Sequence, residues 1–161
     1  MKIQLKKELR GEFQEITIEK GTSIEELYKT MENELPYTVL AAKVNNKLVT
    51  LAYKIHRDCH IEFLDMRTQV ANLIYQNSLT LIYLKAVYDV LGDFEVDIEN
   101  SLNKGLFTEI KSDVPITAAQ VREIEKRMHE IVAKNLPLER IELTKEEAEN
   151  FFIQSGRGGK I

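Results

Sequence analysis

The sequence has no tryptophan, one cysteine, three prolines and seven glycines among its 161 residues. The single cysteine, Cys59, excludes an internal disulfide framework and is typical of a protein in a reducing compartment. No apolar run approaches the roughly 18–20 residues of a membrane span. The start of the chain, residues 1–7, lacks the apolar stretch of a secretory signal. These absences predict a folded cytoplasmic protein with no membrane segment.

An excess of positive charge is also missing. The net charge is −4, with ten basic and ten acidic side chains in residues 1–64 and twelve basic against sixteen acidic in residues 65–161. Proteins that bind nucleic acid usually carry a basic excess. Five acidic side chains follow one another without a basic residue among them: Asp89, Asp93, Glu95, Asp97 and Glu99. Their field would repel a phosphate backbone, which argues against nucleic-acid binding by this half.

The first segment alternates between apolar and polar positions, which predicts two strands around a turn near Arg10-Gly11. A helix should begin after Thr22 or Ser23, either of which can cap it, and should end at Pro36. Asn45 and Asn46 predict a hairpin turn, because asparagine tolerates a positive φ. The expected strands cover residues 3–5, 13–18, 39–44, 48–51 and 60–64. This order of elements predicts a ubiquitin-like β-grasp domain over residues 1–64.

After Asp65 the apolar period becomes helical, so we expect a boundary at residues 64–68 and a second domain over residues 66–161. A long helix should end at Gly92, and a third helix should follow its cap, Thr117. Thr144 and Glu147 form a capping box for a last helix. The expected strands cover residues 94–98, 106–110 and 138–143. The core stripe expected on the third helix is Val121, Ile124, Met128, Ile131 and Val132. The whole chain is therefore predicted to have an α+β fold.

The long helix, residues 66–91, carries an apolar stripe with one strongly polar member, Asn77. The stripe consists of Val70, Leu73, Ile74, Asn77, Leu81, Leu84, Tyr88 and Leu91. A second apolar face consists of Ile82, Tyr83, Ala86, Val87 and Val90, so we expect this helix to be buried on several sides. A buried amide costs roughly 1–3 kcal/mol if it is unpaired. Asn77 is therefore either a hydrogen-bonded residue of the core or groove, or a residue that contacts a ligand.

Few side chains suit catalysis or metal binding. On a regular strand His56 and His60 would lie about 13 Å apart, which is too far for one zinc ion, and Cys59 would face the other way. No oxyanion motif accompanies Cys59, and His129 is expected to be exposed. The glycine-rich stretch 156–160 lacks the final Ser/Thr of a Walker loop and follows a helix rather than a strand. We therefore expect no catalytic residue, metal or cofactor in this chain.

Residues 1–64 resemble the TGS domain, a ubiquitin-like module of threonyl-tRNA synthetases, some GTPases and stringent-response enzymes. Residues 66–161 resemble the domain that follows it in threonyl-tRNA synthetases and hydrolyses tRNA mischarged with serine. The matching stretches are residues 86–110, which end in Lys104-Gly105-Leu106-Phe107-Thr108-Glu109-Ile110, and residues 123–131, which contain Glu125-Lys126-Arg127-Met128.

The resemblance implies that the editing chemistry is lost. The family's His-x-x-x-His motif falls on Asn77 and Leu81, and neither side chain can act as a general base near neutral pH. Thr108 stands where a tyrosine is expected, and Lys160 matches a lysine of the editing pocket. The scaffold should still form a groove. The candidate ligand-binding residues are Asn77, Leu81, Lys104, Phe107, Thr108 and Lys160.

The same pair of domains precedes a P-loop kinase domain in bacterial nucleoside kinases of the uridine kinase group. The histidine-free helix and residues 99–107 resemble that group more closely. The sequence therefore favours a non-catalytic, regulatory or ligand- or partner-binding N-terminal region of a nucleoside kinase. The alternative is an RNA-binding or degenerate tRNA-editing module, and a third interpretation is a structural oligomerisation module. The expected partners are a C-terminal P-loop kinase domain and a small ligand or RNA.

Overall fold

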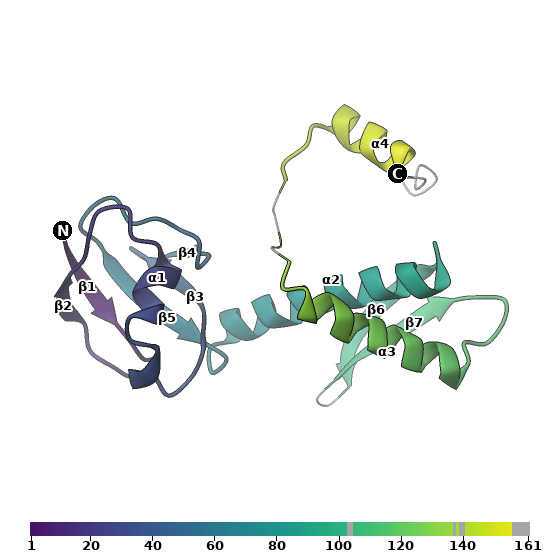
Figure 1. The fold of residues 1–161 in the computed structure, drawn as a ribbon, viewed down its shortest axis with the longest axis horizontal. Helices are drawn as coiled ribbons and strands as arrows, with labels where there is room; N and C mark the ends of the chain where they lie inside the picture. The colour runs from purple at the N-terminus through teal and green to yellow at the C-terminus, as the bar shows by residue number, and fades with distance from the viewer. Residues whose placement is uncertain (103–104, 137, 139–140, 156–161) are drawn as a thin grey trace. The chain divides into compact units, whose positions relative to one another are not determined.

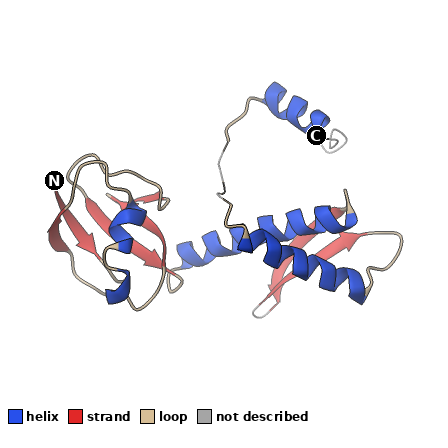
Figure 2. Ribbon diagram, in the orientation of Figure 1, coloured by secondary structure: helices blue, strands red, loops and turns tan. Residues whose placement is uncertain are grey.

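The computed structural model of the chain describes residues 1–102, 105–136, 138 and 141–155 and has the predicted α+β fold (Figures 1 and 2). The chain divides into two compact units, Met1–Leu79 and Thr80–Ile161. The division falls within the long helix α2 (Gln69–Leu91). The domain boundary expected at residues 64–68 stays a prediction. In the described part of the chain, every helix is too short or too polar to span a membrane.

The first unit contains a five-stranded mixed sheet in the order β2-β1-β5-β3-β4. Strand β1 runs parallel to β5, and the other neighbouring strands are antiparallel. The strands are β1 (Lys2–Lys6), β2 (Gln14–Thr17), β3 (Val39–Val44), β4 (Lys47–Val49) and β5 (His60–Asp65). With a helix packed on one face (Figure 1), this is the β-grasp arrangement predicted from the sequence.

Helix α1 (Ile24–Lys29) covers one face of the sheet and contributes to its core. Ser23 caps it as predicted, since its side-chain oxygen accepts a hydrogen bond from the Glu26 N–H at 3.1 Å. The prediction that the helix continues to Pro36 is wrong. The Thr30 hydroxyl donates to the Leu27 carbonyl at 2.7 Å, a local bond that competes with helical hydrogen bonding. A short 3₁₀ turn, Glu32–Glu34, follows instead.

The hairpin between β3 and β4 turns at the two predicted asparagines. Asn45 and Asn46 have φ values of 49° and 68°, in the left-handed region that asparagine adopts more readily than most residues. Strand β4 is shorter than the predicted 48–51. The turn is also held to β5, because the Asn45 side-chain oxygen accepts from the His60 N–H at 2.9 Å.

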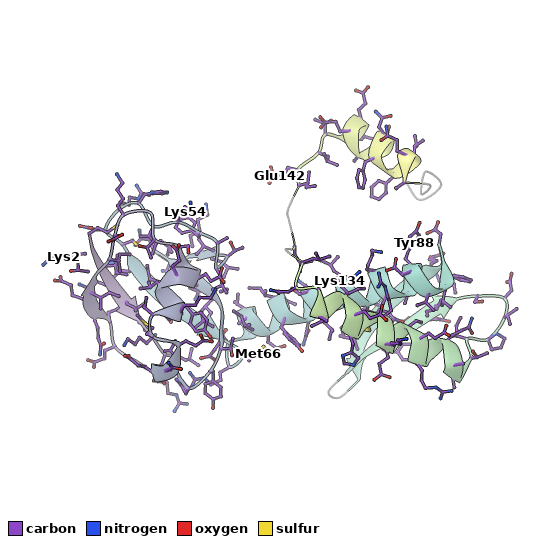
Figure 3. All side chains as sticks on the ribbon, viewed as in Figure 1. Lys2, Lys54, Met66, Tyr88, Lys134 and Glu142 are labelled. Atoms are coloured by element: carbon purple, nitrogen blue, oxygen red, sulfur yellow. The ribbon has the colours of Figure 1, made fainter. Side chains whose placement is uncertain are left out.

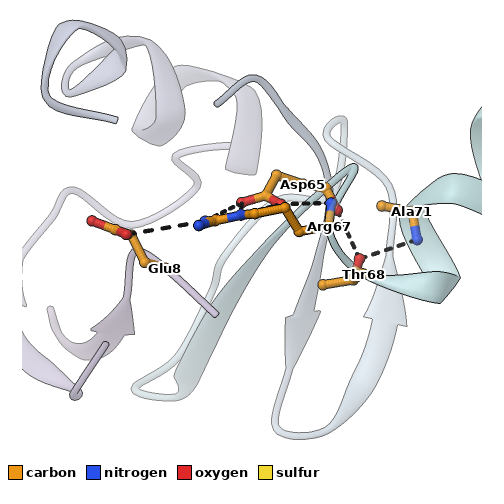
Figure 4. A network of polar contacts seen from close by, with 5 residues as sticks. All are labelled: Glu8, Asp65, Arg67, Thr68 and Ala71. Carbon is orange, nitrogen blue, oxygen red and sulfur yellow. Dashed lines mark hydrogen bonds and ion pairs between the residues drawn. The ribbon is translucent and has the colours of Figure 1, made fainter. Parts of the chain in front are cut away.

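A buried carboxylate organises the junction between β5 and α2 (Figure 4). Asp65 is 7% exposed and accepts hydrogen bonds from the Arg67 N–H, Nε and Nη2, the last at 2.7 Å. These bonds, chiefly those from the guanidinium, lower the pKa of Asp65. The Thr68 hydroxyl donates to the Asp65 carbonyl and accepts from the Ala71 N–H, so it caps the start of α2. Arg67 also lies over the Tyr37 ring, 4.3 Å from its centroid.

The second unit contains the C-terminal half of α2, a hairpin and two further helices. These elements are β6 (Glu95–Leu102), β7 (Gly105–Lys111), α3 (Ala118–Ala133) and α4 (Lys145–Gln154). Gly92 ends α2 as predicted, with φ of 95° and its N–H donating to the Tyr88 carbonyl at 2.9 Å. Thr117 caps α3 as predicted, in a capping box with Gln120, and Thr144 forms the predicted capping box of α4.

Two predictions for the segments that follow the hairpin are wrong. Leu138 and residues 141–143, the described part of the strand predicted at 138–143, are not in a strand. Alternating sequence is insufficient there, because a strand also needs a partner for its backbone groups. On α3 the predicted core stripe is too wide: Ile124 is buried, whereas Val121 and Val132 are exposed. His129 is exposed, as expected.

Candidate functional site

The core of the second unit lies between α2, the β6–β7 hairpin and α3. Ala86 and Val87 of α2 and Ile124 of α3 are buried together. Val96 and Ile110, which are opposite one another in the hairpin, pack against them. The unit is therefore a helix pair joined to a two-stranded sheet by one small apolar core.

The face of α2 that enters this core is chiefly the second apolar face, and the stripe with Asn77 contributes Leu91. The core-facing members are Tyr83, Ala86, Val87 and Val90. Asn77 is exposed, and the Leu81 side chain is 56% exposed. Tyr88, labelled in Figure 3, is exposed as well. The expected burial of α2 is therefore wrong for most of this stripe, although Ile74 and Leu91 pack against apolar cores. Asn77 carries no burial cost, because water can reach its amide.

The hairpin separates two other candidate residues. Thr108 is half-buried, and its hydroxyl oxygen lies 3.1 Å from the Tyr83 hydroxyl oxygen of α2. Phe107 precedes it on β7 and is 46% exposed. Successive side chains of a strand point to opposite faces, so Phe107 lies on the face away from α2. Phe107 and Thr108 therefore lie on opposite faces of the hairpin.

The remaining candidates are placed as follows. Lys104 and Lys160 lie outside the described residues. Two hollows of this unit border the C-terminal end of α2, with volumes of ≈ 310 Å³ and ≈ 640 Å³. Both include Phe94, and neither is lined by Leu81 or Thr108. A ligand-binding role for the six candidate residues stays a prediction.

The acidic run is largely paired with basic side chains. Lys111 lies 2.7 Å from Glu95 and 2.9 Å from Asp97, and these bonds raise the pKa of the Lys111 ammonium. Asp89 accepts from Lys85 and, at 2.8 Å, from Arg127, and hydrogen bonds from these two side chains lower the pKa of Asp89. Asp89, Glu95 and Asp97 therefore have cationic partners. The repulsion of anions is weaker than the count of acidic residues predicts.

The structure gives the histidines and the cysteine no shared chemistry. His56 lies in the loop before β5, and His60 is the first residue of β5. Cys59 is buried, and burial raises the pKa of its thiol, which disfavours the reactive thiolate at neutral pH. Within the described ranges, no three His, Cys, Asp or Glu side chains form a group that could hold a metal ion.

Sequence reasoning missed the role of Tyr83, the partner of Thr108. The only available signal was its position as the hydroxyl-bearing member of the second apolar face. Tyr83 and Thr108 are 25 positions apart in the sequence. Their contact therefore depends on which face of α2 packs against the hairpin.

The fold defines the class of the protein. It is an α+β protein with a β-grasp unit, followed by a unit in which a β-hairpin lies between helices in the sequence. No family model matches the chain. The chain is similar to the threonine–tRNA ligase of Desulforamulus reducens, at 30% identity over 88% of this chain and 22% of the relative. The corresponding ligase of Clostridium kluyveri is 28% identical over 91% of this chain and 23% of the relative. Threonine–tRNA ligase 2 of Bacillus subtilis is 27% identical over 94% of this chain and 23% of the relative.

The matches thus extend over about nine-tenths of this chain, across both units. The chain spans less than a quarter of the length of the curated relatives it matches.

Proposed function

We propose that this chain is a non-catalytic, RNA-binding module related to threonine–tRNA ligases, and that its RNA is a tRNA. The observation that carries the proposal is the similarity to these ligases over about nine-tenths of the chain. The names of the relatives identify tRNA as the molecule on which they act. The proposal extends that substrate class, but not the ligase reaction, to this chain.

The absence of catalysis is proposed from residue chemistry. The resemblance puts Asn77 and Leu81 at the positions of the family's two editing histidines. Neither an amide nor an aliphatic side chain can take a proton from water near neutral pH. Both side chains are exposed on α2, where they could contact RNA without reacting with it.

The charge distribution is compatible with RNA binding despite the net charge of −4. Lys111 neutralises part of the field of Glu95 and Asp97, and Arg127 does the same for Asp89. The first unit is balanced in charge. Local cationic surfaces, rather than the total charge, would therefore determine where a phosphate backbone can approach.

Binding is tested by fluorescence anisotropy with a labelled threonine tRNA transcript at two salt concentrations. We expect a dissociation constant in the range of roughly 10⁻⁴ to 10⁻⁶ M that weakens as salt rises, because phosphate contacts release counterions. A small acidic protein without RNA-binding function is the matched control. No anisotropy change at low salt, up to the highest protein concentration used, would contradict the proposal.

The second candidate function is a regulatory or ligand-binding region of a nucleoside kinase in the cytoplasm. It is favoured by the resemblance of the histidine-free helix and residues 99–107 to the uridine kinase group. Its partners would be a P-loop kinase domain and a small ligand. The coding sequence after Ile161 tests it: a strand followed by Gly-x-x-x-x-Gly-Lys-Ser/Thr supports the kinase context, and a class II synthetase core removes it.

A further inference from the structure

The loop between β4 and β5 is fastened by its backbone to the start of α1 and to the residues before it. The Tyr53 carbonyl accepts from the Ile24 N–H at 3.0 Å, and the Ile55 carbonyl accepts from the Gly21 N–H at 2.7 Å. The Ile55 N–H in turn donates to the Thr22 carbonyl at 2.9 Å. Ile55 is also a buried member of the core, so the loop has a fixed place in the first unit.

A hollow of ≈ 280 Å³ is lined by residues of this loop and of the β3–β4 hairpin. Its apolar part is formed by Val44, Ile55 and Cys59, which are buried members of the core. Tyr53, 42% exposed, adds an aromatic ring. Ligand pockets usually have volumes of roughly 300 Å³ or more, so this hollow suits a small molecule with a single ring.

Two cationic side chains without acidic partners complete the lining of this hollow. Lys47 and Arg57 are exposed, and among the described residues neither forms an ion pair. Asp58 follows Arg57 but does not line the hollow, and its carboxylate accepts from the Lys2 N–H at 3.1 Å. The hollow is therefore positively charged. Lysines of the same unit that do have a glutamate partner are Lys2, Lys6, Lys7, Lys29 and Lys43.

We infer that this hollow is a binding site for a small aromatic carboxylate. The ring of the ligand packs on the apolar part of the hollow beside Tyr53, and its carboxylate faces Lys47 and Arg57. Aromatic pairs add to the energy of apolar burial, and a guanidinium can hold a carboxylate through two parallel hydrogen bonds. The inference goes beyond RNA binding and does not depend on it.

The test compares benzoate with benzamide, a neutral molecule of nearly the same shape, by ¹H–¹⁵N correlation NMR of the full chain. Benzoate should shift the amide signals of the lining residues, with a dissociation constant of roughly 10⁻³ M for a ligand of about nine non-hydrogen atoms. Benzamide should bind about three-fold or more weakly, because it carries no charge for the two cations to attract.

Substitutions separate the charged part of the site from its apolar part. Lys47→Gln and Arg57→Gln should each weaken benzoate binding about two- to five-fold and leave benzamide binding unchanged. Tyr53→Ala should weaken the binding of both molecules, because they share the ring. Lys20→Gln and Tyr75→Ala are the matched controls, since both residues are exposed and neither lines the hollow. Circular dichroism melting confirms that each variant is folded.

The Cys59 thiol provides a second readout, because a bound ring would cover it. Benzoate should slow the reaction of Cys59 with a neutral dipyridyl disulfide, and should slow it less in Arg57→Gln. The site is wrong if benzoate shifts no amide signal, if benzoate and benzamide bind equally, or if both glutamine variants bind benzoate as the unsubstituted chain does. None of these results bears on RNA binding, which is measured in its own assay.

Discussion

The hydroxyl oxygen of Tyr83 lies 3.1 Å from that of Thr108, although 25 positions separate the two residues. The hydrogen bond joins α2 to β7 beside the small core of the second unit. Thr108 stands where the resemblance to editing domains expects a tyrosine of the reactive pocket. Its hydroxyl instead joins two elements of the fold, so a ligand would have to compete with Tyr83 for it.

This pair yields a prediction on stability. Tyr83→Phe and Thr108→Val should each lower the free energy of unfolding by about 0.5–1.5 kcal/mol, because each leaves a half-buried hydroxyl without this partner. Urea unfolding of both single variants and the double variant measures their coupling. Strictly additive losses would show that the two hydroxyls do not interact.

The buried carboxylate of Asp65 predicts a pH dependence. Its pKa is lowered from the ordinary value of 3.8 by hydrogen bonds from Arg67, so the charged form is favoured in the folded chain. Its stabilising contribution is therefore complete above the unfolded-state pKa and is lost as the pH falls through the lower folded-state pKa.

Asp65→Asn should lower the free energy of unfolding at neutral pH by roughly 1.5–3 kcal/mol, the contribution of hydrogen bonds to a charged group. In this variant the free energy of unfolding should also fall less steeply as the pH is lowered. Urea unfolding between pH 2 and pH 7 (about the range over which carboxyls titrate) measures both effects. Glu8→Gln is the control, since Glu8 lies at the outer limit of ion pairing, 4.0 Å from Arg67. If the free energy of unfolding of Asp65→Asn fell with decreasing pH as steeply as that of the unsubstituted chain, Asp65 would not be the source of this pH dependence.

The cap of α3 predicts a local loss of stability. The Thr117 side chain accepts from the Gln120 N–H at 3.3 Å, and α3 supplies Ile124 to the core. Thr117→Ala should lower the free energy of unfolding by about 0.5–2 kcal/mol, and Thr117→Ser should restore most of it. Equal stability of the alanine and serine variants would show that the cap contributes nothing.

Cys59 should react slowly. Burial of its side chain restricts access and raises the pKa of the thiol, so the thiolate fraction is small in the folded chain. A chromogenic disulfide reagent at mildly alkaline pH should label folded protein far more slowly than urea-unfolded protein. Equal rates would place the thiol in a reactive environment.

Much of the first unit could be predicted from its sequence, because the informative signals there are local. Ser23 caps α1 through the neighbouring Glu26, and Asn45 and Asn46 adopt their own turn conformation. The strand predicted at residues 39–44 coincides with β3. Each of these features depends on neighbours a few residues away.

The second unit was harder to predict because α2 is apolar around much of its circumference. Periodicity identified two faces, but it could not say that Ala86 and Val87, rather than Leu81, would meet the hairpin. That choice depends on packing between distant segments, as does the contact from Tyr83 to Thr108.

The central claim, RNA binding without hydrolysis, is tested most directly with radiolabelled seryl-tRNA. The labelled tRNA is incubated with an excess of the chain, and the complex and the intact ester are measured in the same samples by filter retention and acid precipitation. We predict that the tRNA is retained and that the ester decays at the rate of the protein-free blank. Decay faster than the blank, or no retention at low salt, would contradict the account.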